Sequence, residues 1–294
     1  MISSLPQLGS LKVKVWLNGK LVDESQAVVS IYDHGLLYGD GVFEGIRVYN
    51  GKVFQAGAHL ERLFNSADAI CLKIPYSRDQ LNEAMNQLVQ TNNEPYIRLA
   101  VTRGIGTLGL NPYLCRGPQV FIINDHIQLY PKELYENGLA VIIARTVRCS
   151  PQMVNPLVKS LNYLNNIYAK IEAADAAVAE ALMLNQYGNI AEASGDNVFI
   201  VKGGEVITPP PEAGILKGIT RGIVLELAGR QGLPKAERDF TPAELYAADE
   251  CFLTGTAAEV VPVTHVDGKT IGAGKAGPVT RTLMAAYKDF IAKS

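Results

Sequence analysis

The chain has 294 residues, of which 48% are hydrophobic and 19% are charged, with 27 basic against 29 acidic side chains. This length allows two domains of ordinary size, and the composition is typical of a globular enzyme rather than a disordered chain. The net charge of −2 lacks the basic excess of a general nucleic-acid or membrane-surface binder. No apolar run approaches the roughly 20 residues of a spanning helix, and the N-terminus lacks a secretory signal pattern. We therefore expect a cytoplasmic protein without membrane or nucleic-acid partners.

The cysteines and histidines indicate neither a disulfide framework nor a metal site. The four cysteines, at positions 71, 115, 149 and 251, lie far apart and form no C-x-x-C pair. The four histidines do not show metal-ligand spacing. We predict free thiols in a reducing compartment and no bound metal.

The N-terminal half reads as hairpins and helices. Asn-Gly turns at 18–19 and 50–51 predict two β-hairpins, since this dipeptide favours tight hairpin turns. We expect strands at 13–17, 20–22, 45–49, 52–54, 97–102 and 120–124, helices at 59–71 and 77–90, and a Gly/Pro-rich loop at 104–118. The pattern loosens afterwards, and we predict an interdomain loop at 126–137 that follows a smaller α/β domain at 1–125.

The C-terminal half, 138–294, is predicted to be a larger α/β domain. Strands are expected at 139–145, 181–185, 197–201, 205–208 and 251–254, and helices at 163–178, 220–229 and 278–293. Two matches to G-x-G-x-x-G, at 104–109 and 272–277, lack the βαβ context of a dinucleotide site. We interpret both as ordinary glycine loops.

Two turns could bind phosphate. In GILKGITR (214–221), Gly218 precedes an expected helix start, where free backbone N–H groups and the helix dipole favour an anion and the Thr220 hydroxyl adds a donor. The turn Thr254–Ala257 follows a strand and offers further N–H groups. Each turn alone is also compatible with an ordinary helix cap or loop.

Lys159 is the strongest nucleophile candidate, since the sequence has no G-x-S-x-G motif and no adjacent Cys and His. Its neighbours Leu157, Val158 and Leu161 are apolar, and desolvation of a lysine favours the neutral amine that a Schiff base requires. Tyr163 follows four residues later. On the local residues alone, a lysine that extends along apolar surface with its amine in water is the favoured interpretation.

Glu192 lies between two expected apolar strands, in IAEASGDNVF (190–199). A buried acid is either paired with a cation or functional, and a pyridinium nitrogen would be a suitable partner. A phosphate-binding turn, a desolvated lysine and a buried carboxylate together match the requirements of pyridoxal 5'-phosphate (PLP).

These motifs resemble the class IV aminotransferases. The match runs through EASGDNVF (192–199), VIT (206–208) and LKGITR (216–221), and further segments resemble the branched-chain amino acid aminotransferases of that class. Those segments are YGDGVFEGIR (38–47), HLERL (59–63), YIRLAVTRGIGTLGL (96–110), KSLNYLNN (159–166) and TGTAAEV (254–260). The resemblance implies a two-domain α/β (α+β type) chain with the D-amino acid aminotransferase-like fold, PLP fold type IV.

The resemblance also implies roles for individual residues. Lys159 matches the catalytic lysine that binds PLP and moves the proton, Glu192 the acid at the pyridine nitrogen, and Arg62 the phosphate arginine. Tyr163 matches the tyrosine at the phenolic oxygen, although in some relatives that residue lies five positions after the lysine rather than four. The remaining expected PLP contacts are Gly195, Leu216, Gly218, Ile219, Thr220, Gly255 and Thr256.

The implied reaction is transamination between branched-chain L-amino acids and 2-oxoglutarate. Tyr38, Phe43, Gly45, Tyr96, Arg98, Tyr130, Thr256 and Ala257 match the substrate pocket. Arg98 is expected to bind the γ-carboxylate of glutamate, and Thr256–Ala257 the substrate α-carboxylate.

The implied assembly is a homodimer, or a higher oligomer, in which the loop at 104–114 reaches the neighbouring subunit's site. Alternatives on the same fold are a D-amino acid or (R)-amine transaminase and an aminodeoxychorismate lyase. A protein that only binds a phosphate-bearing ligand is the alternative from another functional class.

Overall fold

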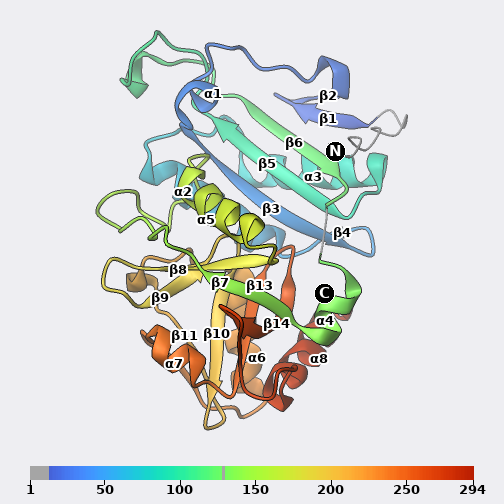
Figure 1. Ribbon diagram of the computed structural model, residues 1–294. Helices are drawn as coiled ribbons and strands as arrows, with labels where there is room; N and C mark the ends of the chain where they lie inside the picture. The colour runs from blue at the N-terminus through green and yellow to red at the C-terminus, as the bar shows by residue number, and fades with distance from the viewer. Residues whose placement is uncertain (1–12, 128–129) are drawn as a thin grey trace, which may run out of the picture.

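A computed structural model describes residues 13–127 and 130–294 (Figure 1). The first 12 residues of the predicted N-terminal domain, and residues 128–129 of the predicted link, lie outside the described residues. The described strands form a six-stranded sheet from the N-terminal part and a nine-stranded sheet from the C-terminal part. The predicted mixture of helices and strands in both halves is confirmed.

The N-terminal sheet is antiparallel, in the order β2-β1-β6-β5-β3-β4. Its strands are β1 (Lys14–Leu17), β2 (Lys20–Asp23), β3 (Gly41–Tyr49), β4 (Lys52–Val53), β5 (Tyr96–Thr102) and β6 (Val120–Asp125). Both Asn-Gly turns have positive φ at both residues, as this type of hairpin turn requires, and both predicted hairpins are confirmed. Strand β3 begins four residues earlier than the predicted strand, because its first residues pair with the end of β5.

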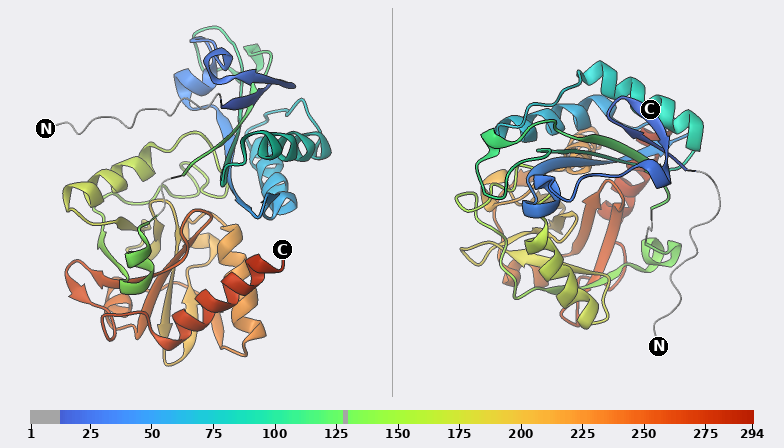
Figure 2. Two further views of the ribbon diagram at one scale, coloured as in Figure 1. Left: turned by 90° about the vertical axis from the view of Figure 1, so that its right-hand side faces the viewer. Right: turned by 90° about the horizontal axis from the view of Figure 1, so that it is seen from above.

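Helices α2 (Ala56–Ala69) and α3 (Arg78–Asn92) cover one face of this sheet (Figure 2). Ser77 and Gln80 form a capping box that starts α3. Alternate residues of β3 point to opposite faces, so Val42 and Ile46 join the core beneath the helices. The opposite face of β3, which carries Phe43 and Gly45, does not join this core. The short helix α1 (His34–Tyr38) precedes β3.

The C-terminal sheet has the order β12-β11-β10-β13-β14-β7-β8-β9, with β15 beside β14. Its strands are β7 (Leu139–Ile143), β8 (Glu180–Leu184), β9 (Ile190–Ala193), β10 (Asn197–Lys202), β11 (Glu205–Thr208), β12 (Lys235–Glu237), β13 (Glu250–Gly255), β14 (Glu259–Val266) and β15 (Lys269–Thr270). The helices are α4 (Lys132–Asn137), α5 (Leu164–Asp175), α6 (Ile219–Arg230), α7 (Pro242–Tyr246) and α8 (Pro278–Ala292). Single 3-10 turns occur at η1 (Glu24–Gln26), η2 (Pro112–Leu114) and η3 (Pro211–Ala213).

Several elements differ from the prediction. The segment expected to be a loop at 126–137 contains α4 (Lys132–Asn137), which begins after Pro131 and ends before Gly138. Glu192 does not lie between strands but inside β9, which pairs with β8. The prediction also lacked β14, the longest strand of this sheet. Helix α5 lies at the level where the two sheets meet (Figure 1).

The four cysteines all lie in the described part of the chain and are free thiols, as predicted. No helix among the described residues combines the length and the apolar character needed to cross a bilayer.

Candidate active site

A cavity of about 490 Å³ brings together residues from both sheets. Its volume lies within the range of roughly 300–1,000 Å³ typical of small-molecule sites. The predicted site residues that line it are Phe43, Gly45, Arg62, Tyr96, Arg98, Lys159, Tyr163, Gly195, Leu216, Gly218, Ile219, Thr220, Gly255, Thr256 and Ala257. Glu192 lines a smaller adjoining hollow that shares Lys159, Tyr163, Gly195 and Leu216 with the cavity.

The backbone around Lys159 is fixed at the free edge of β3. The Phe43 N–H donates to the Lys159 carbonyl at 3.0 Å, and the Leu161 N–H donates to the Gly41 carbonyl at 2.9 Å. On its other side, the Lys159 N–H donates to the Ser66 hydroxyl at 3.1 Å. A segment without regular secondary structure of its own is therefore bound along β3 by backbone hydrogen bonds of the kind that join two strands.

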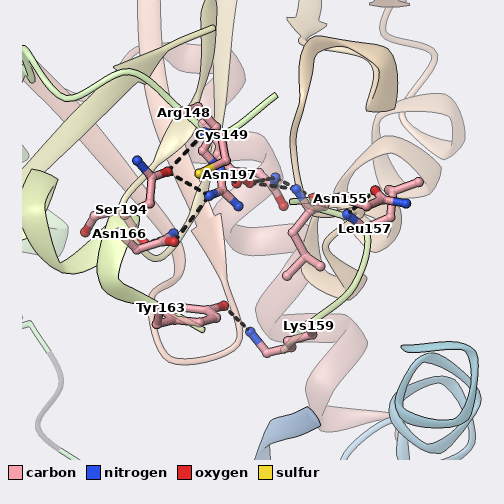
Figure 3. A network of polar contacts seen from close by, with 12 residues as sticks. Arg148, Cys149, Asn155, Leu157, Lys159, Tyr163, Asn166, Ser194 and Asn197 are labelled. Atoms are coloured by element: carbon pink, nitrogen blue, oxygen red, sulfur yellow. Dashed lines mark hydrogen bonds and ion pairs between the residues drawn. The ribbon is translucent and has the colours of Figure 1, made fainter. Parts of the chain in front are cut away.

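The Lys159 amine lies among aromatic side chains. It donates to the Tyr163 hydroxyl at 2.8 Å and lies 4.5 Å from the centre of the Phe43 ring, where the ring face attracts a cation. Of the apolar neighbours that the sequence suggested, Leu161 lines the cavity and Val158 the adjoining hollow together with Lys159, whereas Leu157 is 43% exposed. The four-residue spacing nevertheless places Tyr163 against Lys159 (Figure 3).

Glu192 is buried, 4% exposed, and all its partners are donors. Its Oε1 accepts from Arg148 Nε at 2.8 Å, and its Oε2 accepts from the Leu216 N–H at 2.9 Å and from the Asn197 amide at 3.2 Å. Burial raises the pKa of Glu192, and the charge and hydrogen bonds of Arg148 oppose the rise. Arg148 is itself oriented by Asn165 and Asn166. Figure 3 shows Arg148, Asn166 and Asn197 of this network together with the Lys159–Tyr163 pair.

Arg62 reaches the cavity from α2 and is held by a buried carboxylate. Its Nε and Nη2 each donate to Glu44 at 2.7 Å, and its Nη1 donates to the Lys217 carbonyl at 3.2 Å. Burial raises the pKa of Glu44, but the hydrogen bonds and charge of Arg62, together with His59, outweigh it and lower the pKa to about 2. Burial lowers the pKa of His59, so its neutral ring donates from Nδ1 to Glu44 Oε2 at 2.8 Å.

Both predicted phosphate turns face the cavity. Gly218 caps α6 without a side-chain hydrogen bond, and the N–H groups of Ile219 and Thr220 have no acceptor within the helix. A Cβ on Gly218 would lie 2.1 Å from Asn197 Oδ1, so only glycine allows this approach. On the second turn, the buried Thr254 hydroxyl has no hydrogen-bond partner in the described part of the chain.

Another wall of the cavity comes from β3 and β5. Arg98 lies opposite Gly45 in the strand register, and its guanidinium lies 4.6 Å from the centre of the Phe43 ring. Arg98 Nη2 donates to the Tyr96 hydroxyl at 3.3 Å. The Tyr96 ring lies over Gly45, where a Cβ would approach the Tyr96 hydroxyl to 1.9 Å. Gly45 therefore leaves room for the Tyr96 ring.

Two predicted pocket residues, Tyr38 and Tyr130, are not among the described residues that line the cavity. The Tyr38 hydroxyl accepts from the Gly109 N–H at 3.1 Å, so this residue contacts the loop at 104–118. Tyr130 packs beside Tyr135, with its hydroxyl 3.5 Å from Glu180.

Glu44 and Arg148 are two site residues that were not predicted from the sequence. Glu44 interrupts an otherwise uncharged run at 41–46, and an acid at a core-facing strand position is a signal that reasoning from the sequence could have used. No local pattern distinguishes Arg148, whose acid partner lies 44 residues away.

Comparisons with known proteins agree with this geometry. The family model for class IV amino-transferases matches residues 41–266. The chain is 47% identical over 283 residues to a Methanocaldococcus jannaschii protein provisionally named branched-chain-amino-acid aminotransferase, covering 96% of this chain and 97% of that protein. It is 38% identical over 284 residues to a D-alanine aminotransferase of Bacillus licheniformis, covering 95% of this chain and 97% of that protein.

Two solved structures of branched-chain amino acid aminotransferases share the fold. The Escherichia coli structure has a TM-score of 0.92 and 34% identity, and the alignment covers 96% of this chain and 95% of the other. The Thermobaculum terrenum structure, in its PLP form, has a TM-score of 0.87 and 30% identity, with 96% and 94% covered. The predicted fold type IV is confirmed. With the family model matched across both sheets, the chain belongs to the class IV aminotransferases.

Proposed function

We propose that this chain is a PLP-dependent branched-chain amino acid aminotransferase that exchanges amino groups between leucine, isoleucine or valine and 2-oxoglutarate. The observation that carries the substrate assignment is Arg98. Its guanidinium lines the cavity against an aromatic ring, and no carboxylate in the described residues pairs with it. A guanidinium that has no carboxylate partner and lies beside the Phe43 and Tyr96 rings suits both a carboxylate-bearing and an apolar substrate side chain.

The side chains present fit PLP. The N-terminus of α6, Arg62 and the unpartnered Thr254 hydroxyl offer donors to a phosphate, a group that helix N-termini bind well. Glu192, which Arg148, Asn197 and the Leu216 N–H hold in place, would hold a protonated pyridine nitrogen. When bound, PLP supplies an electron sink for the negative charge that develops at the substrate Cα.

Lys159 is the catalytic residue in this proposal. Its amine would hold PLP and, once released by the incoming amino acid, take the proton from the substrate Cα. The Tyr163 hydroxyl and the Phe43 ring keep the amine at the cavity surface. The turn at Thr256–Ala257 would receive the substrate α-carboxylate through its backbone N–H groups.

The aromatic walls and Arg98 explain the dual substrate requirement. The rings of Phe43 and Tyr96 provide apolar contacts for a branched aliphatic side chain. When glutamate occupies the same site, its γ-carboxylate would bind the Arg98 guanidinium in a charge-assisted hydrogen bond.

A single half-reaction tests this function. Protein that carries PLP is mixed separately with L-leucine, L-glutamate, D-alanine or an aromatic amine, and the absorbance of the bound cofactor is followed. We expect rapid conversion with both L-leucine and L-glutamate. Conversion with D-alanine or the amine alone would keep the site but replace the substrate assignment with one of the alternative transaminases.

We further propose that the protein is a cytoplasmic homodimer in which the second copy completes the site. Its four free thiols suit a reducing compartment. On α5, Leu164, Ile167, Tyr168 and Ile171 form a helical stripe that is about half exposed, and Ile167 also lines the cavity. The loop at 104–118 exposes Leu108 and Leu110 by 73% and 79%. A second copy that covers these apolar surfaces would also enclose the cavity.

Light scattering tests the dimer. Tyr168→Glu in the α5 stripe should produce monomers and lower the transamination rate. The matched control is Tyr187→Glu, at a side chain that is 74% exposed outside the stripe, and it should leave both unchanged. A fully active monomer would contradict the proposed assembly.

A further inference from the structure

The turn at 256–258, which joins β13 to β14, is fixed by a contact from the other sheet. Thr256 and Ala257 line the cavity, and the two strands meet where Gly255 pairs with Glu259. Glu259 has φ +58°, in the left-handed region that non-glycine residues adopt only when their surroundings enforce it. The side chain of Glu259 therefore needs partners that hold it in place.

Those partners are Arg47 and Tyr49, two residues apart on the face of β3 that points away from α2 and α3. The Tyr49 hydroxyl donates to Glu259 Oε1 at 2.7 Å, and Arg47 Nη2 lies 3.8 Å from the same oxygen. The Arg47 guanidinium also lies 5.0 Å from the centre of the Tyr49 ring. On the same face of the same strand, Phe43 and Gly45 line the cavity. One strand thus contacts Lys159 at its start and Glu259 at its end.

Arg47 makes few interactions other than the one with Glu259. Its side chain is only 10% exposed, and its Nε and Nη1 have no hydrogen-bond partner within the described residues. Burying guanidinium N–H groups without hydrogen-bond partners costs free energy. Among the described residues, Glu259 is the carboxylate that forms an ion pair with Arg47, and no other carboxylate there competes for it. Tyr135 of α4 and Tyr287 of α8 also face this pair. Burial raises the pKa of both phenols to about 12, so both are neutral.

From this arrangement we infer that Glu259 is a positioning residue for the substrate α-carboxylate. Tyr49 and Arg47 hold its side chain, and Glu259 in turn holds the backbone of the turn at 256–258, whose N–H groups we assign to the substrate. The inference rests on the proposed function, since it assigns the α-carboxylate to this turn. Because amino acids and 2-oxo acids share that carboxylate, loss of the contact should weaken both substrate classes by a similar factor.

The test is Tyr49→Phe, which removes one hydroxyl and keeps the ring. The matched control is Tyr246→Phe, which removes a tyrosine–carboxylate hydrogen bond of the same length, to Asp267 Oδ2 at 2.7 Å, at a residue that is not among the described residues lining the cavity. The probe is 4-methylpentanoate, the carbon skeleton of leucine without its amine, titrated into PLP-loaded protein through the cofactor absorbance.

For Tyr49→Phe we expect the Kd of 4-methylpentanoate to rise about fivefold to twentyfold. This is less than the roughly tenfold to hundredfold effect of losing a direct hydrogen bond to a charged group, because Tyr49 acts on the carboxylate only through Glu259. The KM values of L-leucine and 2-oxoglutarate should rise by a similar factor, while kcat and the affinity for PLP stay within about twofold. Equal Kd values for Tyr49→Phe and Tyr246→Phe would overturn the inference.

A second variant separates side-chain contacts from backbone preference. Glu259→Gly tolerates the positive φ but cannot bind Tyr49 or Arg47. We expect it to bind 4-methylpentanoate as weakly as Tyr49→Phe does, and unchanged affinity would contradict the positioning role. The Kd for this carboxylate can be measured whether or not L-leucine reacts. Failure of the unchanged protein to convert L-leucine would therefore count against the proposed function and not against Glu259.

Discussion

Arg62 and Glu44 form a two-pronged ion pair, with Nε to Oε1 and Nη2 to Oε2 both at 2.7 Å. This parallel geometry is the strongest form of carboxylate recognition by arginine. Glu44 is fully buried, so the pair is screened little by solvent. The third arm of Arg62 reaches the carbonyl of Lys217, just before α6. One buried acid therefore positions a cation beside the helix N-terminus that we propose binds phosphate.

Replacing Glu44 with Gln should lower stability in a pH-dependent way. The pKa of Glu44 falls from 4.5 to about 2 in the folded state, which corresponds to about 3 kcal/mol of stability. A lowered acid pKa stabilises the fold fully above pH 4.5, and the contribution disappears as the pH falls toward 2. Urea unfolding at pH 7, 4 and 3 should show the difference between the two proteins shrinking. A constant difference would contradict the ion pair's role.

Glu192→Gln should separate cofactor binding from chemistry. The amide retains the shape of the side chain but cannot stabilise a protonated pyridine nitrogen. We expect PLP to bind within about tenfold of normal and the transamination rate to fall by at least about a hundredfold, the usual effect of removing one electrostatic partner of the transition state. Equilibrium dialysis and single-turnover absorbance measure the two quantities. Equal losses in both would mean that Glu192 serves only to build the site.

Arg98→Leu should discriminate between the two substrate classes. The variant removes the guanidinium that faces the cavity and leaves an apolar side chain on β5. We expect the KM for L-glutamate to rise about tenfold to a hundredfold, as for loss of a charge-assisted hydrogen bond, and the KM for L-leucine to change less than about threefold. A parallel loss for both substrates would show that Arg98 supports the fold of the pocket.

Asp196→Asn should flatten the pH dependence of carboxylate binding. Burial and the nearby Glu180 carboxylate raise the pKa of Asp196 to about 7, and Asp196 lines the cavity together with Gly255 and Thr256. As the pH rises through 7, the new negative charge should repel a bound carboxylate and raise the Kd of 4-methylpentanoate about fivefold to tenfold between pH 6 and pH 8. If the Kd of 4-methylpentanoate depended on pH in the same way in the unchanged protein and in Asp196→Asn, a group other than Asp196 would be responsible for the pH dependence.

The fold was predictable where local chemistry decides it. The Asn-Gly hairpins and the capping box before α3 depend on neighbouring residues, and the sequence alone identified both hairpins and that helix. Strand β14, which was not predicted, contains Pro262, a residue that normally argues against an inner strand. Its place in the sheet depends on pairing with β13 and β7, which no local pattern encodes.

The site residues that could be predicted are likewise those that lie in local sequence motifs. Lys159, Glu192 and the α6 turn lie in short motifs with recognisable chemistry. Glu44, Arg148 and Arg47 act through partners that are 18, 44 and 212 positions away along the chain. The first two pairs form within one half of the fold, and the Arg47–Glu259 pair forms only when the two sheets come together. In each case the partner is identified only by the three-dimensional structure.

The central claim is that Lys159 is the catalytic residue of this cavity. The most direct measurement is the single-turnover rate with L-leucine for Lys159→Ala, reconstituted with PLP, beside the control Lys202→Ala at an exposed lysine on β10. We predict a loss of at least about a thousandfold for Lys159→Ala, within the usual range for removing a general base, and an unchanged rate for the control. A Lys159→Ala protein that reacts within about tenfold of the unchanged enzyme would contradict the assignment.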